Sequence, residues 1–161
     1  MKKPVATGRE QMLEVLKQFR VLLRSIRRHY QWVEKQCGVS GAQLWALAEI
    51  DSSPGISVTD LAGRLAIHVS TASNLLKRLD TLELIVRTRV ADNQRVVRVH
   101  VTEKGKDILK KAPRPFAGIL QQALLELPPA RLGALNAELV EVVRRIKIKD
   151  TKAGATPLSE M

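Results

Sequence analysis

The sequence predicts a mainly α-helical fold that contains one small β-hairpin. Apolar residues recur every three or four positions over most of the 161 residues, which is the period of helices with one buried face. In two short stretches, 85–90 and 97–101, hydrophobicity instead alternates residue by residue, as in half-buried β-strands. The polar run 91–95 between them predicts the turn of a hairpin. A chain of this length accommodates one domain, or one domain and an arm.

The chain is strongly basic, with 27 Lys and Arg residues against 16 Asp and Glu residues and a net charge of +11. Such a charge favours a polyanionic partner, with nucleic acid ahead of an acidic membrane surface. No apolar run approaches the roughly 18 residues of a membrane span, and the N-terminus lacks the apolar stretch of a secretory signal. The single cysteine, Cys37, excludes an intramolecular disulfide. We therefore expect a cytoplasmic protein without a membrane partner.

A long amphipathic helix is predicted over 8–36. Thr7 and Glu10 have the spacing of a capping box at its start, and Gly38 ends it. Its apolar stripe consists of Met12, Leu16, Phe19, Leu23, Ile26, Tyr30 and Val33.

Two short helices are predicted next. Ser40 and Gln43 form a second capping box, and the helix that they open ends in the turn run 51–55. Ser57 can cap the following helix, with Asp60 in its first turn, where the helix dipole favours an acid.

A fourth helix, about 69–82, has two distinct faces. Its apolar face consists of Ala72, Leu75, Leu76 and Leu79. Two short helices joined by a tight turn are typical of a helix-turn-helix, whose second helix reads base edges in a major groove. The side chains placed to do so are Ser70, Thr71, Ser73, Asn74 and Lys77. Taken alone, such a polar face is more often solvated surface.

The hairpin that follows carries basic residues on a narrow ribbon. These are Arg87, Arg89, Arg95 and Arg98. They suit contact with the phosphate backbone or insertion into a minor groove, as in a DNA-binding wing. Alternating arginines also protect a strand edge against aggregation. The polar-faced helix and the basic hairpin, in this order, favour DNA binding over both alternatives.

Helices are predicted again after the hairpin. Thr102 is expected to cap a fifth helix, which Pro113 and Pro115 must interrupt because proline lacks an N–H and clashes with the preceding turn. Apolar spacing resumes over 116–127, and a proline pair then starts the last helix. The tail 149–161 is polar and aperiodic, so it is expected to be disordered.

These patterns predict a winged helix-turn-helix fold with N- and C-terminal dimerisation helices. The first and last helices carry apolar stripes too long for one winged domain to cover, so two chains are expected to cover each other's terminal helices. The alternative is a monomer in which these helices fold onto the winged domain. The expected segments are an N-terminal dimerisation helix (1–36), a winged helix-turn-helix DNA-binding domain (37–101), C-terminal dimerisation helices (102–148) and a disordered tail (149–161).

Residues of about 10–147 resemble the MarR family of winged helix-turn-helix transcriptional regulators. The most specific match is Arg95–Gly105, a wing that ends in Thr-Glu-Lys-Gly; Leu61–Leu65, Ser70–Leu79 and Leu84–Arg87 also match. The resemblance implies a homodimer whose interface is formed by the first, fifth and sixth helices. It also implies recognition helices in successive major grooves of a pseudo-palindromic operator, with the wings in the flanking minor grooves.

With this resemblance, the residues expected to contact DNA are Ser70, Thr71, Ser73, Asn74, Lys77, Arg78, Arg87, Arg89, Asn93, Gln94 and Arg95. Two positions depart from the family pattern. Glu83 stands where the family usually has glycine, so it must adopt a left-handed conformation or change the turn. Asn93 stands where the family commonly has the aspartate of an Asp-x-Arg wing motif. Arg95 is retained, and either Asn93 or Asp92 could orient it.

The resemblance further implies that a small ligand or an oxidant shifts the two reading heads and releases DNA. A ligand would lie between the winged domain and the dimerisation helices, where the candidates are Arg27, Tyr30 and Trp45. An aromatic or anionic effector is expected, because arginine binds carboxylates. For the arginine stripe of the first helix as a whole, a solvated face or added phosphate contact is the favoured interpretation over effector binding. This stripe consists of Arg20, Arg24, Arg27 and Arg28.

Cys37 could be a peroxide-reactive thiol, as in one branch of the family. It stands at the C-terminal end of a helix, where the dipole disfavours a thiolate, so a structural cysteine is the favoured interpretation. His29, His68 and His100 are far apart and lack carboxylates at ligand spacing, so neither a metal site nor a cofactor is expected.

The sequence therefore predicts a homodimeric, sequence-specific DNA-binding transcriptional regulator, a repressor that a small effector releases. The alternative is a low-specificity architectural DNA-binding protein without effector sensing, which the spread of charge along the chain also suggests. No Ser/His/Asp set, paired-carboxylate motif or phosphate loop points to an enzyme.

Overall fold

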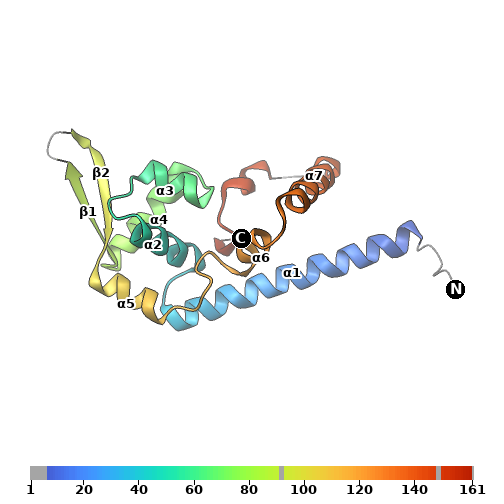
Figure 1. The fold of residues 1–161 in the computed structure, drawn as a ribbon, viewed down its shortest axis with the longest axis horizontal. Coiled ribbons are helices and arrows are strands. Elements are labelled where there is room, and N and C mark those ends of the chain that lie inside the picture. Colours follow the sequence, from blue (N-terminus) through green and yellow to red (C-terminus); the bar gives the residue numbers. More distant parts are fainter. Residues whose placement is uncertain (1–6, 91–92, 148–149, 161) are drawn as a thin grey trace.

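Helices and one hairpin make up the computed structural model, which describes residues 7–90, 93–147 and 150–160 (Figure 1). The mainly α fold with a two-stranded antiparallel hairpin confirms the predicted fold class. The α-helices are α1 (Gly8–Cys37), α2 (Gly41–Ser52), α3 (Val58–Leu65), α4 (Val69–Thr81), α5 (Glu103–Lys111), α6 (Ile119–Leu125) and α7 (Pro129–Arg145). The strands are β1 (Ile85–Val90) and β2 (Asn93–Val101), and two 3₁₀ turns are η1 (Thr151–Ala155) and η2 (Leu158–Glu160).

The hydrophobic core lies within the unit formed by α2, α3, α4 and the hairpin. Its largest fully buried side chains are Leu44, Leu47, Ile50, Leu61, Leu75, Leu76, Leu79 and Val99, together with Val33 near the end of α1. Burial of one such aliphatic side chain contributes roughly 1.5–3 kcal/mol. This packing fixes which face of each short helix points inward and therefore which face remains available to a partner.

The helix starts that the sequence predicts are confirmed. Thr7 Oγ1 accepts a hydrogen bond from the Glu10 amide at 3.3 Å, and a Glu10 carboxylate oxygen accepts one from the Thr7 amide at 2.7 Å. Ser40 and Gln43 form the same reciprocal pair at the start of α2. Ser57 and Thr102 each cap their helix through a side-chain oxygen. These caps satisfy amides that no helical carbonyl can reach.

The hairpin is antiparallel, with Arg87 opposite Val99 and Thr88 opposite Arg98. Strand β2 begins at Asn93, four residues before the start predicted from alternation, and the register shifts between Arg89 and Val90. This first part of β2 is defined by backbone hydrogen bonds to β1 and not by alternating side chains. Its residues belong to a polar run, so hydrophobic alternation could not predict it as a strand. Residues 91–92 of the predicted tip lie outside the described residues.

The predicted interruption after α5 is confirmed. Helix α5 ends at Lys111, and α6 begins only at Ile119. The Arg114–Pro115 peptide between them is cis, and Gly118 has a φ of 110°, a conformation that favours glycine. Helix α7 starts at the second residue of the proline pair, Pro129, as predicted.

The unit formed by α2, α3, α4 and the hairpin is called the winged unit below. Helix α1 extends away from it, so the N-terminal end of α1 and the hairpin lie at opposite ends of the molecule (Figure 1). At 1.5 Å per residue its 30 residues span about 45 Å. Only Val33 and Cys37 of this helix are buried. Leu23 is 66% exposed, and none of the described residues Pro129–Arg145 of α7 is buried. Both helices therefore present apolar side chains that the described part of the chain leaves uncovered.

The disordered tail predicted for 149–161 is wrong over the described residues 150–160. This segment forms η1 and η2, and its end packs against α1 and α2. The Ser159 hydroxyl oxygen accepts a hydrogen bond from the Ala42 amide at 3.0 Å. Contacts with residues more than a hundred positions away hold the segment, and no local periodicity could reveal them.

Candidate nucleic-acid interface

A tight turn sets the angle between α3 and α4. Ala66 adopts the left-handed conformation with a φ of 52°, and the Ile67 amide donates to the Ala62 carbonyl at 3.0 Å. This hydrogen-bond pattern closes the end of α3 and turns the chain into α4. The buried Ala72, together with the leucines of the apolar face, then holds α4 against α2 and α3. The geometry is that of a helix-turn-helix.

The opposite face of α4 is open to solvent. Ser70, Ser73, Asn74 and Lys77 are exposed, and Thr71 is half-buried. The N-cap residue His68 makes no side-chain capping hydrogen bond, so the first amides of α4 have no side-chain acceptor from that residue. This face combines short hydrogen-bonding side chains, one ammonium group and a positive helix end, a combination that suits a polyanion.

Arg78 lies at the edge of this face. Its Nη1 atom is 3.4 Å from a carboxylate oxygen of Glu160 in η2, although its side chain remains 62% exposed. The predicted DNA contact at Arg78 therefore has an internal acidic partner. Sequence reasoning missed Glu160 because the tail carries no periodic pattern.

The structure gives different surroundings to the arginines of the hairpin. Arg87 is half-buried and its Nε lies 3.5 Å from Asp80 of α4, while Arg98 donates to the Gly55 carbonyl at 3.0 Å. These two side chains fasten the hairpin to the helical unit. Arg89 is exposed. The side chains of Asn93, Gln94 and Arg95 lie outside the described residues, so their predicted contacts stay predictions.

The sequence predicted that Glu83 either adopts a left-handed conformation or changes the turn after α4. Glu83 has a φ of 61°, which is the left-handed conformation. The Leu84 amide donates to the Leu79 carbonyl, and the Glu83 amide donates to the Asp80 carbonyl, both at 2.9 Å. These are the two hydrogen bonds of a Schellman motif, the ending that usually employs glycine. The turn therefore has the geometry that glycine usually forms, with Glu83 in the left-handed conformation.

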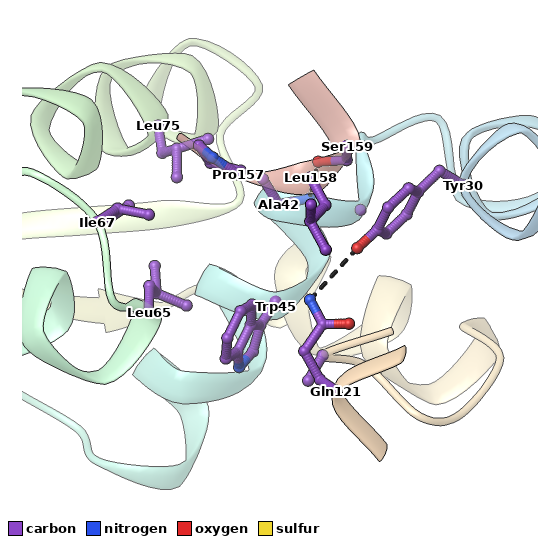
Figure 2. A pocket seen from close by; sticks show the side chains of 12 residues that line it. Tyr30, Ala42, Trp45, Leu65, Ile67, Leu75, Gln121, Pro157, Leu158 and Ser159 are labelled. Carbon is purple, nitrogen blue, oxygen red and sulfur yellow. Dashed lines mark hydrogen bonds between the residues drawn. The ribbon is translucent and has the colours of Figure 1, made fainter. Parts of the chain in front are cut away.

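Two of the three predicted effector residues meet in one groove between α1, α2, α3 and α4 (Figure 2). Tyr30 and Trp45 line it, and the Tyr30 hydroxyl accepts a hydrogen bond from the Gln121 side-chain amide at 3.4 Å. Trp45 donates through its indole nitrogen to Glu49 at 3.0 Å. Arg27 does not line this groove; it lies in the adjacent open groove along α1, which Tyr30 also borders.

Cys37 is only 8% exposed and belongs to the hydrophobic core. Burial raises the pKa of its thiol, because an apolar surrounding disfavours the thiolate. Burial also lowers the pKa of His29, since it disfavours the imidazolium.

Among the described residues, no group of three or more His, Cys, Asp or Glu side chains is placed to hold a metal ion. None of the described helices is long and apolar enough to span a bilayer.

Comparison with known proteins agrees with this geometry. A sequence profile described as the MarR family matches residues 38–95. The HTH-type transcriptional regulator SarZ of Staphylococcus epidermidis is 28% identical over 90 residues, which cover 56% of this chain and 61% of SarZ. The chain thus matches less than two thirds of the length of this curated relative.

Solved structures extend the likeness beyond the winged unit. The multiple antibiotic-resistance repressor MarR from Listeria monocytogenes is 25% identical with a TM-score of 0.52, covering 88% of this chain and 99% of that one. FabT of Streptococcus pneumoniae, solved in complex with DNA, is 15% identical with a TM-score of 0.54 and covers 83% of this chain and 95% of that one.

The fold and the exposed face of α4 define a winged helix-turn-helix protein. Residues 38–95 match the MarR family, and the chain as a whole resembles the Listeria MarR repressor in fold. Of the relatives named above, SarZ is a transcriptional regulator and the Listeria protein is a repressor.

Proposed function

We propose that the chain is a homodimeric, sequence-specific DNA-binding transcriptional regulator that acts in the cytoplasm as a repressor released by a small effector. The observation that carries this proposal is the exposed hydrogen-bonding face of α4 beside a basic hairpin. A major groove admits a helix of this width. Asn74 could pair with adenine through both of its polar atoms, and Lys77 could reach guanine or phosphate.

The hairpin would contact the DNA beside the groove that α4 enters. Arg89 is exposed on β1, and the predicted Arg95 belongs to β2. Arg87 and Arg98, which hold the hairpin to the helical unit, would fix its angle rather than carry the main contact. The likeness in fold to FabT, whose structure contains DNA, supports this arrangement.

The uncovered apolar faces of α1 and α7 favour a second copy of this chain as their partner. Leu23 on α1 and Val140 on α7 are 66% and 58% exposed. Burial of these stripes would gain roughly 25 cal/mol per Å². Leu23→Asp should therefore shift the protein toward monomer in sedimentation equilibrium. Ser25→Asp adds the same charge on the opposite side of α1 and should leave the dimer intact. A wild-type monomer at micromolar concentration would refute the dimer.

An aromatic or anionic effector would bind where the winged unit meets α1. Tyr30 and Trp45 line the groove there and could stack on an aromatic ring, while Arg27 in the adjacent groove could bind a carboxylate. Such a ligand would release DNA by favouring dimers whose two recognition helices have the wrong spacing. A thermal-shift screen of aromatic acids tests this site.

Selection of bound duplexes from a random library, followed by gel shift, tests the proposal directly. We expect an enriched pseudo-palindrome that binds at least about 10³-fold more tightly than random DNA. A dimer that neutralises about 6–10 phosphates should lose about 10³–10⁵-fold in affinity between 50 and 200 mM salt. A steep salt dependence with equal affinity for all sequences would instead indicate an architectural DNA-binding protein.

A further inference from the structure

The C-terminal segment lies in the groove that Tyr30 and Trp45 line. Pro157, Leu158 and Ser159 form one wall of this groove (Figure 2). The cavity that remains beside them measures about 20 Å³, which is room for about one water molecule. The segment therefore leaves no room in this groove for a molecule larger than water.

Polar contacts hold the segment at the start of α2. Ser40 caps the amide of Gln43, and Ser159 accepts a hydrogen bond from the amide of Ala42 at 3.0 Å. Both amides belong to the first turn of α2, whose donors have no helical acceptor. Gly41 lies between Ser40 and Ala42, and a Cβ there would collide with the ring of Tyr30 and lie 3.4 Å from the Ser159 Cβ. The absence of a side chain at Gly41 thus lets Tyr30 and the segment approach α2 closely.

Apolar contacts and one ion pair continue this docking toward the recognition helix. Pro157 and Leu75 of α4 face the same groove. One residue past Ser159, the carboxylate of Glu160 lies 3.4 Å from the guanidinium of Arg78, one helical turn after Leu75. A carboxylate at this position resembles a DNA phosphate in charge and in its ability to accept hydrogen bonds from a guanidinium.

We propose that Pro157–Glu160 is an internal peptide ligand of this groove and that Glu160 competes with DNA phosphate for Arg78. The second half of this proposal rests on the proposed DNA-binding function; the first half does not. A molecule that enters the groove must displace the segment, and displacement would free Arg78 for DNA. This gain would offset part of the loss of DNA binding that the same molecule causes by changing the spacing of the two recognition helices. The segment thereby links the groove to Arg78 on α4 through residues of this chain alone.

Amide hydrogen exchange of the full-length protein tests the docking without DNA. Ser159→Ala and Leu158→Asp should each speed exchange of the Ala42 amide by about tenfold, because local opening of the first turn becomes easier. Thr151→Ala changes an exposed residue of the same tail and should leave that rate unchanged. Equal Ala42 exchange in the wild type, Ser159→Ala and Leu158→Asp would overturn the docking.

Binding to a 30-base-pair duplex of mixed sequence in low salt tests the competition. Glu160→Gln should bind about two- to fivefold more tightly than wild type, the range expected from one exposed ion pair. Glu126→Gln makes the same charge change at the C-cap of α6, where the carboxylate accepts a hydrogen bond from Gln122 of that helix, and it should produce a smaller gain. In an Arg78→Gln background the gain from Glu160→Gln should fall to that of Glu126→Gln, because only the general effect of the lost charge remains.

Equal DNA affinities of Glu160→Gln and Glu126→Gln would overturn the proposed competition between Glu160 and DNA phosphate. They would not affect the proposed docking of the segment, which the hydrogen-exchange experiment tests. If neither the wild type nor any variant binds a duplex, the competition falls together with the proposed DNA-binding function. The Ala42 exchange rates would still decide whether the segment occupies the groove.

Discussion

The ammonium group of Lys104 donates a hydrogen bond to the carboxylate of Glu83 at 3.0 Å, across the base of the hairpin. The Thr102 hydroxyl donates to the backbone carbonyl of the same glutamate at 2.8 Å. The end of α4 and the start of α5 are therefore joined at Glu83, a residue with a left-handed backbone. These contacts offset part of the cost of placing a glutamate where glycine is favoured.

Glu83→Gly should be more stable than Glu83→Ala by about 1 kcal/mol, because both variants lose the ion pair and only glycine relieves the left-handed strain. Urea unfolding of the two variants at one pH measures the difference. Wild type should lie within about 1 kcal/mol of the glycine variant, since the exposed ion pair contributes little. An alanine variant as stable as the glycine variant would show that the turn carries no strain.

Gly105→Ala should destabilise the protein by about 1–3 kcal/mol, the usual cost of overpacking. An added Cβ would collide with the Leu84 carbonyl oxygen and lie 2.6 Å from Val101 Cγ1. Gly63→Ala is the matched control, because a Cβ there meets nothing within 4 Å and alanine favours the helix by up to about 1 kcal/mol. Thermal unfolding should move in opposite directions for the two variants, and a stabilised Gly105→Ala would contradict the close approach of α5 to Leu84.

Asn74→Ala should relax sequence preference, whereas Arg95→Ala should weaken binding to all sequences alike. Loss of a base contact costs about 1–3 kcal/mol at one position of the operator, while loss of a phosphate contact lowers the salt slope by about one unit. Gel shifts with the selected duplex and with single-base variants of it distinguish the two effects. Normal binding by Arg95→Ala would refute the predicted role of the wing.

Cys37 should react slowly with a disulfide reagent in the folded protein and rapidly in urea. Its burial and raised pKa both reduce the amount of accessible thiolate. Hydrogen peroxide should therefore leave DNA binding of the wild type unchanged, as it must in Cys37→Ala. Peroxide release of DNA by wild type alone would instead identify Cys37 as a redox sensor.

His29 should make the protein less stable as the pH falls below about 6.5. Burial lowers the pKa of His29 in the folded state, so on acidification the unfolded chain takes up the proton first. Folding stability is therefore lost between the unfolded pKa and the lower folded pKa, and it is regained as the pH rises. His29→Gln should lose less stability than wild type between pH 7 and 5 in urea unfolding. An equal loss in both proteins would assign the effect to other groups.

The sequence predicted those features that short-range chemistry determines. Thr7, Ser40, Ser57 and Thr102 were identified as caps because a capping side chain acts within three residues of its own position. The two faces of α4 followed from helical periodicity, since its leucines recur on one side. The interruption by Pro113 and Pro115 followed from the missing N–H of proline.

Features that depend on tertiary contacts were missed. Alternation along β1 could not distinguish Arg87, which lies against Asp80 of α4, from the exposed Arg89. The aperiodic tail was expected to be disordered because its contacts are not local: Ser159 accepts a hydrogen bond from Ala42, which lies 117 positions earlier. Helical spacing placed Tyr30 on the stripe of α1, but only the fold shows that Tyr30 and Trp45 line one groove.

The contact between Glu160 and Arg78 has a reciprocal consequence. If both the tail and DNA require the same guanidinium, the factor by which the docked tail weakens DNA binding must equal the factor by which bound DNA loosens the tail. The segment Pro157–Glu160 would then act as an intrinsic reporter of DNA occupancy, and its backbone amides would exchange more rapidly when DNA is bound. A label attached within this segment would disturb this equilibrium, so DNA affinities measured on the labelled protein would differ from those of the unlabelled chain.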